Sequence, residues 1–231
     1  MAFLGDIVNG LAIVVGAIIG LIVKRGLPEK WQETIMSGIA LSIVVIGTKM
    51  ALATQNIVVV IVGLALGAII GEICDLEGGM QKIGDWIGDK LAGGSKTAAA
   101  KIAQGFASAS VLFCSGAMAI VGSIQSGLAN DHATLYAKAT LDGIIALVMT
   151  ANLGVGVVFS SLSVIIYQGA IVLMSGIIEP YITQKILNEV TSSGGIMIMA
   201  IGFNMLNLTH VRIANMVPGM FVAAVLAHFF L

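Results

Sequence analysis

Seven polar side chains stand within or beside apolar stretches, and they are the residues of this chain that could do chemistry. Asp142 offers a charged or protonatable group, and the amides offer hydrogen bonds to a small polar solute or oxygen ligands to an ion. The seven candidate path residues are Lys49, Gln125, Asp142, Asn152, Gln168, Asn204 and Asn207. A carboxylate inside an apolar span is expected to face protein or water, because contact with lipid is costly.

The same side chains also have structural interpretations. Lys138 lies one helical turn before Asp142, where the two can form an ion pair that serves packing alone. Lys49 follows an apolar run and can extend its ammonium group to the membrane interface. Neutral amides commonly bond between helices. For Asp142 the sequence leaves both interpretations open.

Motifs of an enzyme or of a metal site do not accompany these residues. The three histidines lack metal-ligand spacing, and Cys74 and Cys114 are too few and too far apart for a metal site. We therefore expect no catalytic activity, no metal and no cofactor. A net charge of −1 without a basic stripe gives no electrostatic basis for nucleic-acid binding.

The composition places these residues in a membrane protein. Hydrophobic residues make up 58% of the chain and charged residues only 10%, whereas a soluble domain has about 25% charged residues. So few charges cannot cover a globular surface, and the lipid bilayer is the expected partner of most of that surface.

Apolar runs of spanning length succeed one another along the chain. A bilayer core needs about 20 apolar residues per helix, which predicts an all-α polytopic fold with about eight, or seven to eight, transmembrane helices. Segment 141–152 decides the number, because it either spans or re-enters. The expected spans are 7–23, 34–53, 57–73, 102–126, a short helix over 141–152, a sixth helix after the break at 152–156, 190–208 and 213–230.

We expect one transmembrane domain over residues 1–231. It comprises a first helix triplet (1–75), an interfacial amphipathic helix (78–92), a central helix pair (100–152) and a second helix triplet (154–231). The two triplets share a spacing of Gly-Ala-Ile, Pro and Gly, which predicts inverted repeats. Chance similarity among helices rich in Gly, Ile and Val is the alternative.

Glycines at four-residue spacing mark faces for close helix packing. Gly63, Gly67 and Gly71 form an uninterrupted run, and Gly16 and Gly20 repeat the spacing. Small residues at this spacing let helix backbones approach one another. The pattern fits packing within one chain and equally packing between two copies in a homo-oligomer.

The short loops carry an asymmetric positive charge. Lys24, Arg25 and Lys30 fall between the first two spans, four lysines fall between the third and fourth, and Arg212 falls between the last two. With eight spans all of these loops lie on one side, which the positive-inside rule makes cytoplasmic. Both termini are then expected outside.

Four motifs together resemble a known family. They are Gly5-Asp6-Ile7-Val8-Asn9, the specific central stretch 116–127 (GAMAIVGSIQSG), Leu141-Asp142-Gly143 and Tyr167-Gln168-Gly169. Over essentially its whole length the chain resembles the DUF554 family of bacterial inner-membrane proteins. The resemblance implies a multi-pass protein of the bacterial plasma membrane and supplies neither a substrate nor functional residues.

These observations favour a transporter or channel for a small solute or ion, with Asp142 as its charged group. The alternative is a membrane scaffold or accessory subunit that transports nothing and uses its glycine faces for assembly. A hydrated polar interior would favour the first, and a dry packed interior would favour the second.

Overall fold

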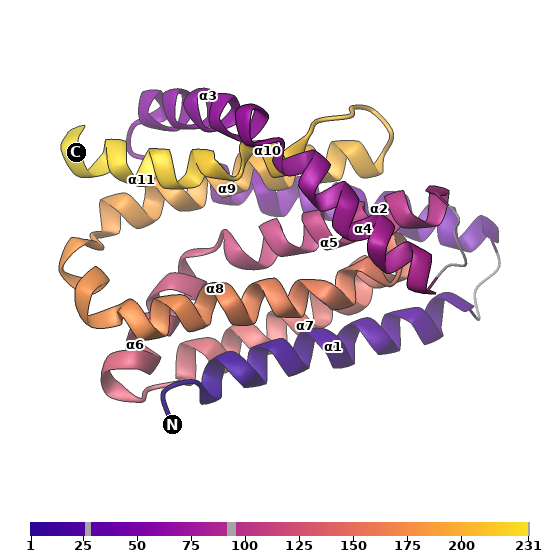
Figure 1. Ribbon diagram of the computed structural model, residues 1–231, viewed down its shortest axis with the longest axis horizontal. Coiled ribbons are helices and arrows are strands. Elements are labelled where there is room, and N and C mark those ends of the chain that lie inside the picture. Colours follow the sequence, from indigo (N-terminus) through magenta and orange to yellow (C-terminus); the bar gives the residue numbers. More distant parts are fainter. Residues whose placement is uncertain (26–28, 92–95, 231) are drawn as a thin grey trace. The chain divides into compact units, whose positions relative to one another are not determined.

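The computed structural model describes residues 1–25, 29–91 and 96–230, and the side chains at 24–25, 29, 32–33, 35–36, 83–85, 87–91, 96 and 117 lie outside that description. The described residues form helices and no strand, as expected (Figure 1). The chain divides into two compact units, and each is considered by itself. Unit 1 contains residues 1–32, 81–114 and 118–180, and unit 2 contains residues 33–80, 115–117 and 181–231.

The helices divide between the units as follows. Unit 1 holds α1 (Leu4–Arg25), α5 (Lys96–Cys114), α6 (Ala117–Ala129), α7 (Ala133–Leu153) and α8 (Gly156–Ile178), while unit 2 holds α3 (Ile57–Cys74), α9 (Gln184–Met205), α10 (Ile213–Met216) and α11 (Pro218–Phe230). The boundary passes through α2 (Glu29–Ala51), α4 (Leu76–Leu91) and the 3₁₀ turn Glu179–Tyr181, and it leaves the first residue of α6 in unit 2.

Most of the expected spans correspond to membrane-length helices. Among the described residues, six helical segments are long and apolar enough to cross a bilayer: α1, α3, α7, α8, α9 and α10–α11 together. The pair α5–α6 adds a seventh if it counts as one bent span. Helix α2 is not among these segments, because its apolar part, Ser37–Ala51, is shorter than a candidate span. The all-α polytopic fold is thus confirmed.

Two helix boundaries differ from the sequence expectation. The fifth helix begins at Ala133 instead of Leu141, because Lys138 and Asp142 pair with each other and leave the helix unbroken. The expected single span over 102–126 is broken after Cys114 and bends by 63°. The expected break after Asn152 is present, and it is centred on Gly154 with φ of +79°.

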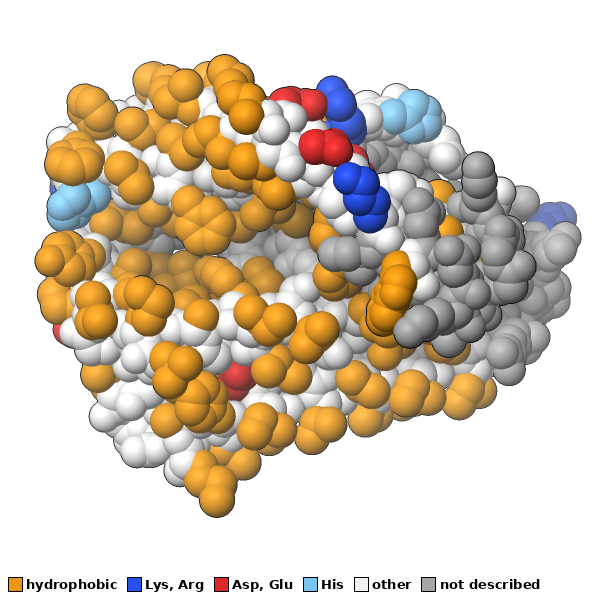
Figure 2. Space-filling view, in the orientation of Figure 1, with side chains coloured by type: hydrophobic (Ala, Val, Ile, Leu, Met, Phe, Trp, Pro, Cys, Tyr) orange, Lys and Arg blue, Asp and Glu red, His pale blue; other side chains and the backbone are white. Residues whose placement is uncertain are grey.

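The exposed surface of both units is largely apolar, as contact with lipid requires. Figure 2 shows hydrophobic side chains over much of the visible face. In α3 the side chain of Ile73 is 80% exposed and that of Ile61 is 58% exposed, whereas Val60 is fully buried. One face of this helix therefore packs on protein, and the other is available to lipid tails.

The glycines of α1 bring it against α7 in unit 1. A Cβ atom at Gly16 would overlap the carbonyl of Gly143, and one at Gly20 would overlap the carbonyl of Leu147. The two backbones are therefore closer than side chains would allow. This contact fixes the face of α1 that carries the buried polar residues described below.

The glycines of α3 serve the same purpose in unit 2, where α3 lies beside α11 (Figure 1). A Cβ atom at Gly63 would meet Ala223 at 2.9 Å, and one at Gly67 would overlap the backbone of Gly219. One turn further, a Cβ atom at Gly71 would overlap the carbonyl of Asn215. The run of glycines is thus filled by another segment of the same chain.

Helices α2 and α9 pack through a reciprocal glycine contact in unit 2. A Cβ atom at Gly47 would meet the Gly195 carbonyl at 2.7 Å and the Met199 amide at 2.6 Å. One at Gly202 would meet the carbonyl of residue 40 at 2.9 Å and the amide of residue 44 at 3.1 Å. The positions contacted in α9, 195 and 199, precede Gly202 by seven and three residues, and those contacted in α2, 40 and 44, precede Gly47 by the same intervals. Each helix therefore makes the same contact with the other.

Replacing Gly67 with Ala should lower the thermal stability of the purified protein, and replacing it with Leu should lower it further. The added atoms have no room against Gly219, and overpacking of this kind costs about 1–3 kcal/mol. Thermal unfolding in detergent measures the effect. Gly176→Ala is the matched control, because no heavy atom lies within 4 Å of that added Cβ. Equal melting temperatures for Gly67→Leu and wild type would mean that α3 does not pack here.

Candidate functional site

A buried ion pair lies at the centre of the polar residues of unit 1. The Lys138 ammonium contacts the carboxylate of Asp142 one turn further along α7. Each residue is only 5% exposed. Lys138 also lies 5.9 Å from the centre of the Phe113 ring of α5, where the negative face of the ring favours a cation. Both charges are thereby withheld from lipid.

Asn9 of α1 links this pair to α8. Its amide nitrogen donates to the Gln168 carbonyl oxygen at 3.3 Å, and its side chain lies near the Asp142 carboxylate. Asn9 and Gln168 are both fully buried. Helices α1, α7 and α8 therefore meet at a group of polar side chains, which we call the α1–α7–α8 cluster: Asp6, Asn9, Lys138, Asp142 and Gln168.

Asp6 completes the cluster on the α1 side. It is 1% exposed, and its Oδ2 lies 3.2 Å from the position of a Cβ atom built on Gly169. Its Oδ1 has no hydrogen-bond partner among the described residues, nor do Oδ1 of Asn9 and Nε2 of Gln168. Buried polar atoms are nearly always paired. The three unpaired atoms make this cluster the candidate site of unit 1.

Two of the seven candidate path residues belong to this cluster, namely Asp142 and Gln168. Asn152 is half-buried at the end of α7, about 15 Å along the helix from Asp142 at 1.5 Å per residue. Gln125 of α6 accepts a hydrogen bond from the Thr134 hydroxyl at 2.7 Å, which ties α6 to the start of α7. The Asp142 site therefore does not include the helix break.

The candidate residues of unit 2 have local contacts. The Asn204 carbonyl oxygen accepts from the Thr209 hydroxyl at 2.7 Å and from the Val211 amide at 2.9 Å, so this side chain shapes the loop before α10. Asn207 takes a left-handed conformation in the same loop, with φ of 57°. Lys49 is exposed near the end of α2.

Unit 2 contains a buried carboxylate that the sequence did not single out. Glu189 of α9 is fully buried. It accepts hydrogen bonds from the Thr54 hydroxyl at 2.5 Å and from the backbone amides of Gln55 at 2.7 Å and Asn56 at 3.2 Å. These donors satisfy the carboxylate and hold the turn before α3. Glu189 is therefore a structural group and not a second candidate site.

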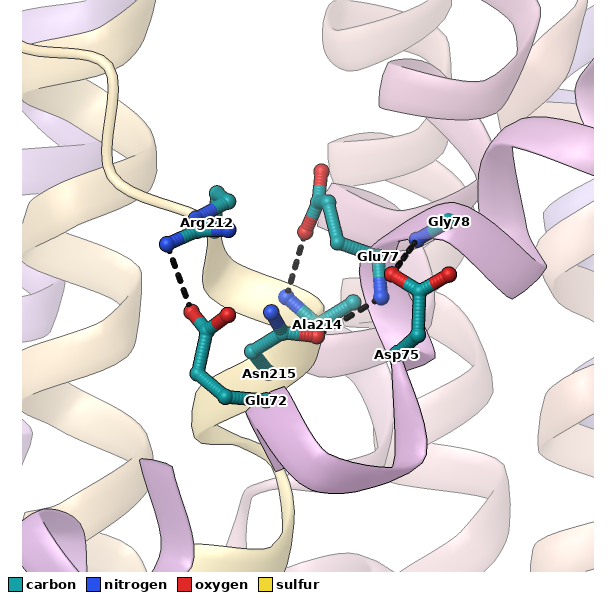
Figure 3. Close-up of polar contacts among 7 residues, drawn as sticks. All are labelled: Glu72, Asp75, Glu77, Gly78, Arg212, Ala214 and Asn215. Atoms are coloured by element: carbon teal, nitrogen blue, oxygen red, sulfur yellow. Dashed lines mark hydrogen bonds and ion pairs between the residues drawn. The ribbon is translucent and has the colours of Figure 1, made fainter. Parts of the chain in front are cut away.

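A second structural contact joins the corner between α3 and α4 to α10 (Figure 3). The backbone amide of Glu77 donates to Asn215 Oδ1 at 2.7 Å, and the Glu77 carboxylate accepts from the backbone amide of Ala214 at 3.1 Å. Arg212 pairs with Glu72 at 2.9 Å, with both side chains substantially exposed. Each of these carboxylates already has a partner, and among the described residues no three His, Cys, Asp or Glu side chains gather as a metal site.

The profile of the family described as "Protein of unknown function (DUF554)" matches residues 4–228. The chain belongs to this family. It is 29% identical over 227 residues to the uncharacterized membrane protein YdfK of Bacillus subtilis (strain 168), which covers 96% of this chain and 94% of that protein. It is 26% identical over 221 residues to the uncharacterized protein YqgA of Escherichia coli (strain K12), covering 95% and 94%. No solved structure matches the chain.

Sequence reasoning missed Asp6 and Asn9 as site residues, although both lie in the first motif of the family resemblance. Their spacing of three residues places them on one helix face. That face also carries Gly16 and Gly20 further along. An acidic and an amide residue on the packing face of an apolar helix was the signal that could have identified them.

Proposed function

We propose that this membrane protein is a passive or secondary transporter for a small solute or ion, with the α1–α7–α8 cluster in its path. The observation that carries the proposal is the burial of Asp6, Lys138 and Asp142 together with two amides on three membrane-length helices. A charged side chain at the centre of a membrane helix costs about 2.5–3.5 kcal/mol on insertion scales, and such residues commonly mark ion and substrate pathways.

Packing alone would not require this arrangement. An apolar group of similar volume in place of a buried ion pair is often neutral or stabilising. A structural role would also lead us to expect hydrogen-bonded polar groups, as in the Glu189 carboxylate, yet Asp6, Asn9 and Gln168 each retain an unpaired atom. The cluster therefore fits binding better than it fits packing.

The scaffold alternative is weakened by the glycines on which it depended. All five packing glycines lie against other segments of this chain: Gly16, Gly20, Gly63, Gly67 and Gly71. A face that is already filled within the chain is unavailable to a partner protein.

The helix contacts also favour an inverted repeat, which is common in secondary transporters. Three helices of the first triplet pack on their counterparts in the second: α1 on α8, α2 on α9 and α3 on α11. The Gly63–Ala223 and Gly67–Gly219 contacts show that α3 and α11 run antiparallel, and the reciprocal contacts of Gly47 and Gly202 show the same for α2 and α9. Antiparallel contact between counterparts is the pattern that inverted repeats produce.

We further propose eight crossings in the bacterial plasma membrane with both termini outside. The count takes α5–α6 as one bent span and includes α2. The lysines and arginines of the short loops then face the cytoplasm. A cysteine added after Leu231, in a variant with Cys74 and Cys114 replaced by Ser, should react with an impermeant thiol reagent in intact spheroplasts. Reaction only after the membrane is opened would place the C-terminus inside and exclude this topology.

The experiment that tests the function measures flux in liposomes with a panel of ions and small polar solutes. We expect at least one to cross faster with the wild-type protein than in empty liposomes. Asp142→Asn should lose this flux by tenfold or more while remaining folded, because the variant keeps the shape of the side chain and loses its charge. Asp131→Asn, a change at an exposed loop residue, is the matched control and should retain the flux.

Thermal unfolding of the same variants separates a transport site from a packing pair. In a packing pair, Lys138→Met and Asp142→Asn each destabilise strongly, since breaking a buried pair costs about 3–5 kcal/mol, and combining them restores stability. For a transport site we expect Asp142→Asn to remain folded and the double variant to gain no flux. The scaffold alternative would be supported if the wild-type protein transports nothing in the panel and the double variant fully recovers its stability.

A further inference from the structure

Two side-chain oxygen atoms of α1 are buried without a hydrogen-bond donor among the described residues. Asp6 and Asn9 are 1% and 0% exposed, and Oδ1 of each has no partner among the described residues. The residues are three apart on one helix, so their side chains are neighbours. A carboxylate oxygen and an amide oxygen are both acceptors. Neither can satisfy the other while Asp6 is ionised.

The beginning of α1 does not satisfy Asp6 either. A carboxylate in the first turn of a helix often accepts a hydrogen bond from a free backbone amide. Here the amide of Leu4 donates to the Met1 carbonyl at 3.1 Å and the amide of Ile7 donates to the Phe3 carbonyl at 3.0 Å. Oδ1 of Asp6 remains without a donor. Its burial is therefore not explained by helix capping.

The charges of the cluster do not cancel. Asp6 and Asp142 contribute two negative charges and Lys138 one positive charge, which leaves one negative charge in a buried group. The other titratable groups around the cluster are His132 before α7, Cys114 of α5 and Tyr167 of α8. None of these three forms an ion pair with Asp6 among the described residues.

We propose that the cluster binds one proton, carried by Asp6 and donated in a hydrogen bond to Oδ1 of Asn9. One proton satisfies both unpaired oxygens and cancels the remaining charge. The inference rests on the proposed transport function and makes the proton its coupling ion. When the proton leaves to water, the Asp6 carboxylate competes with Gln168 and Asp142 for the Asn9 amide, so proton release acts on the contact among α1, α7 and α8.

Infrared spectroscopy of the purified protein, with aspartate labelled by ¹³C, tests the proton site without any substrate. We expect a carbonyl stretching band of a protonated carboxylic acid at neutral pH, sensitive to the label. Asp6→Asn should abolish the band, while the control Asp131→Asn should retain it. Absence of the band, or its persistence in Asp6→Asn, would overturn the assignment.

The pH dependence of unfolding provides a second measurement. If the folded protein holds a proton that the unfolded chain releases, the folding equilibrium weakens as pH rises, by about tenfold per pH unit for one proton. Asp6→Asn should remove this dependence, and Asp131→Asn should keep it. A melting temperature that instead rises with sodium at constant ionic strength, and does so only when Asp6 is present, would identify a metal cation and overturn the proton assignment.

These readouts separate the two proposals. If the labelled band depends on Asp6 but the protein transports nothing across liposome membranes, the proton site stands and the transport function is excluded. If the flux depends on Asp142 but is unaffected by a proton gradient, and the band is absent, the transport function stands and the proton site is excluded.

Discussion

The buried pair of Lys138 and Asp142 is the interaction on which the rest of unit 1 depends. Two charges inside a membrane-length helix are tolerated because they neutralise each other and because α1 brings the Asn9 amide near Asp142. That amide reaches α7 only if α1 lies unusually close to it. Gly16 and Gly20 meet this requirement by letting the backbone of α1 touch the carbonyls of Gly143 and Leu147. Glycine spacing and polar chemistry are therefore two parts of one arrangement.

Unit 2 follows the same packing rule without an unsatisfied centre. Glycines join α2 to α9 and α3 to α11, and the buried carboxylate of Glu189 is fully engaged by the turn before α3. The contrast lies in the two buried acidic side chains: the Glu189 carboxylate is hydrogen-bonded, whereas Oδ1 of Asp6 has no partner among the described residues. This contrast, more than the presence of charge, locates the candidate site.

Hydropathy was enough to predict the all-α membrane fold, because bilayer thickness sets the length of each apolar run. It could not place the start of α7, because the charged Lys138 interrupts the apolar run that hydropathy follows. Nor could it foresee the bend after Cys114, which contains no proline. Of the residues that the sequence singled out, Asp142 and Gln168 lie in one cluster, and their role as a site stays a prediction. It missed Asp6 and Asn9, because their importance comes from facing α8, a helix distant in the sequence.

Water access to the cluster is the most direct test of whether it belongs to a transport path. In a variant with Cys74 and Cys114 replaced by Ser, Asn9→Cys and Gln168→Cys should each react with a small hydrophilic thiol reagent in membranes. Ile166→Cys, at an exposed apolar position of α8, should remain unreactive in lipid, and Asp131→Cys should react fully. Reaction at Asn9 and Gln168 is the result that the account predicts. Complete protection of both, with Asp131→Cys reactive, would show a dry interior and contradict it.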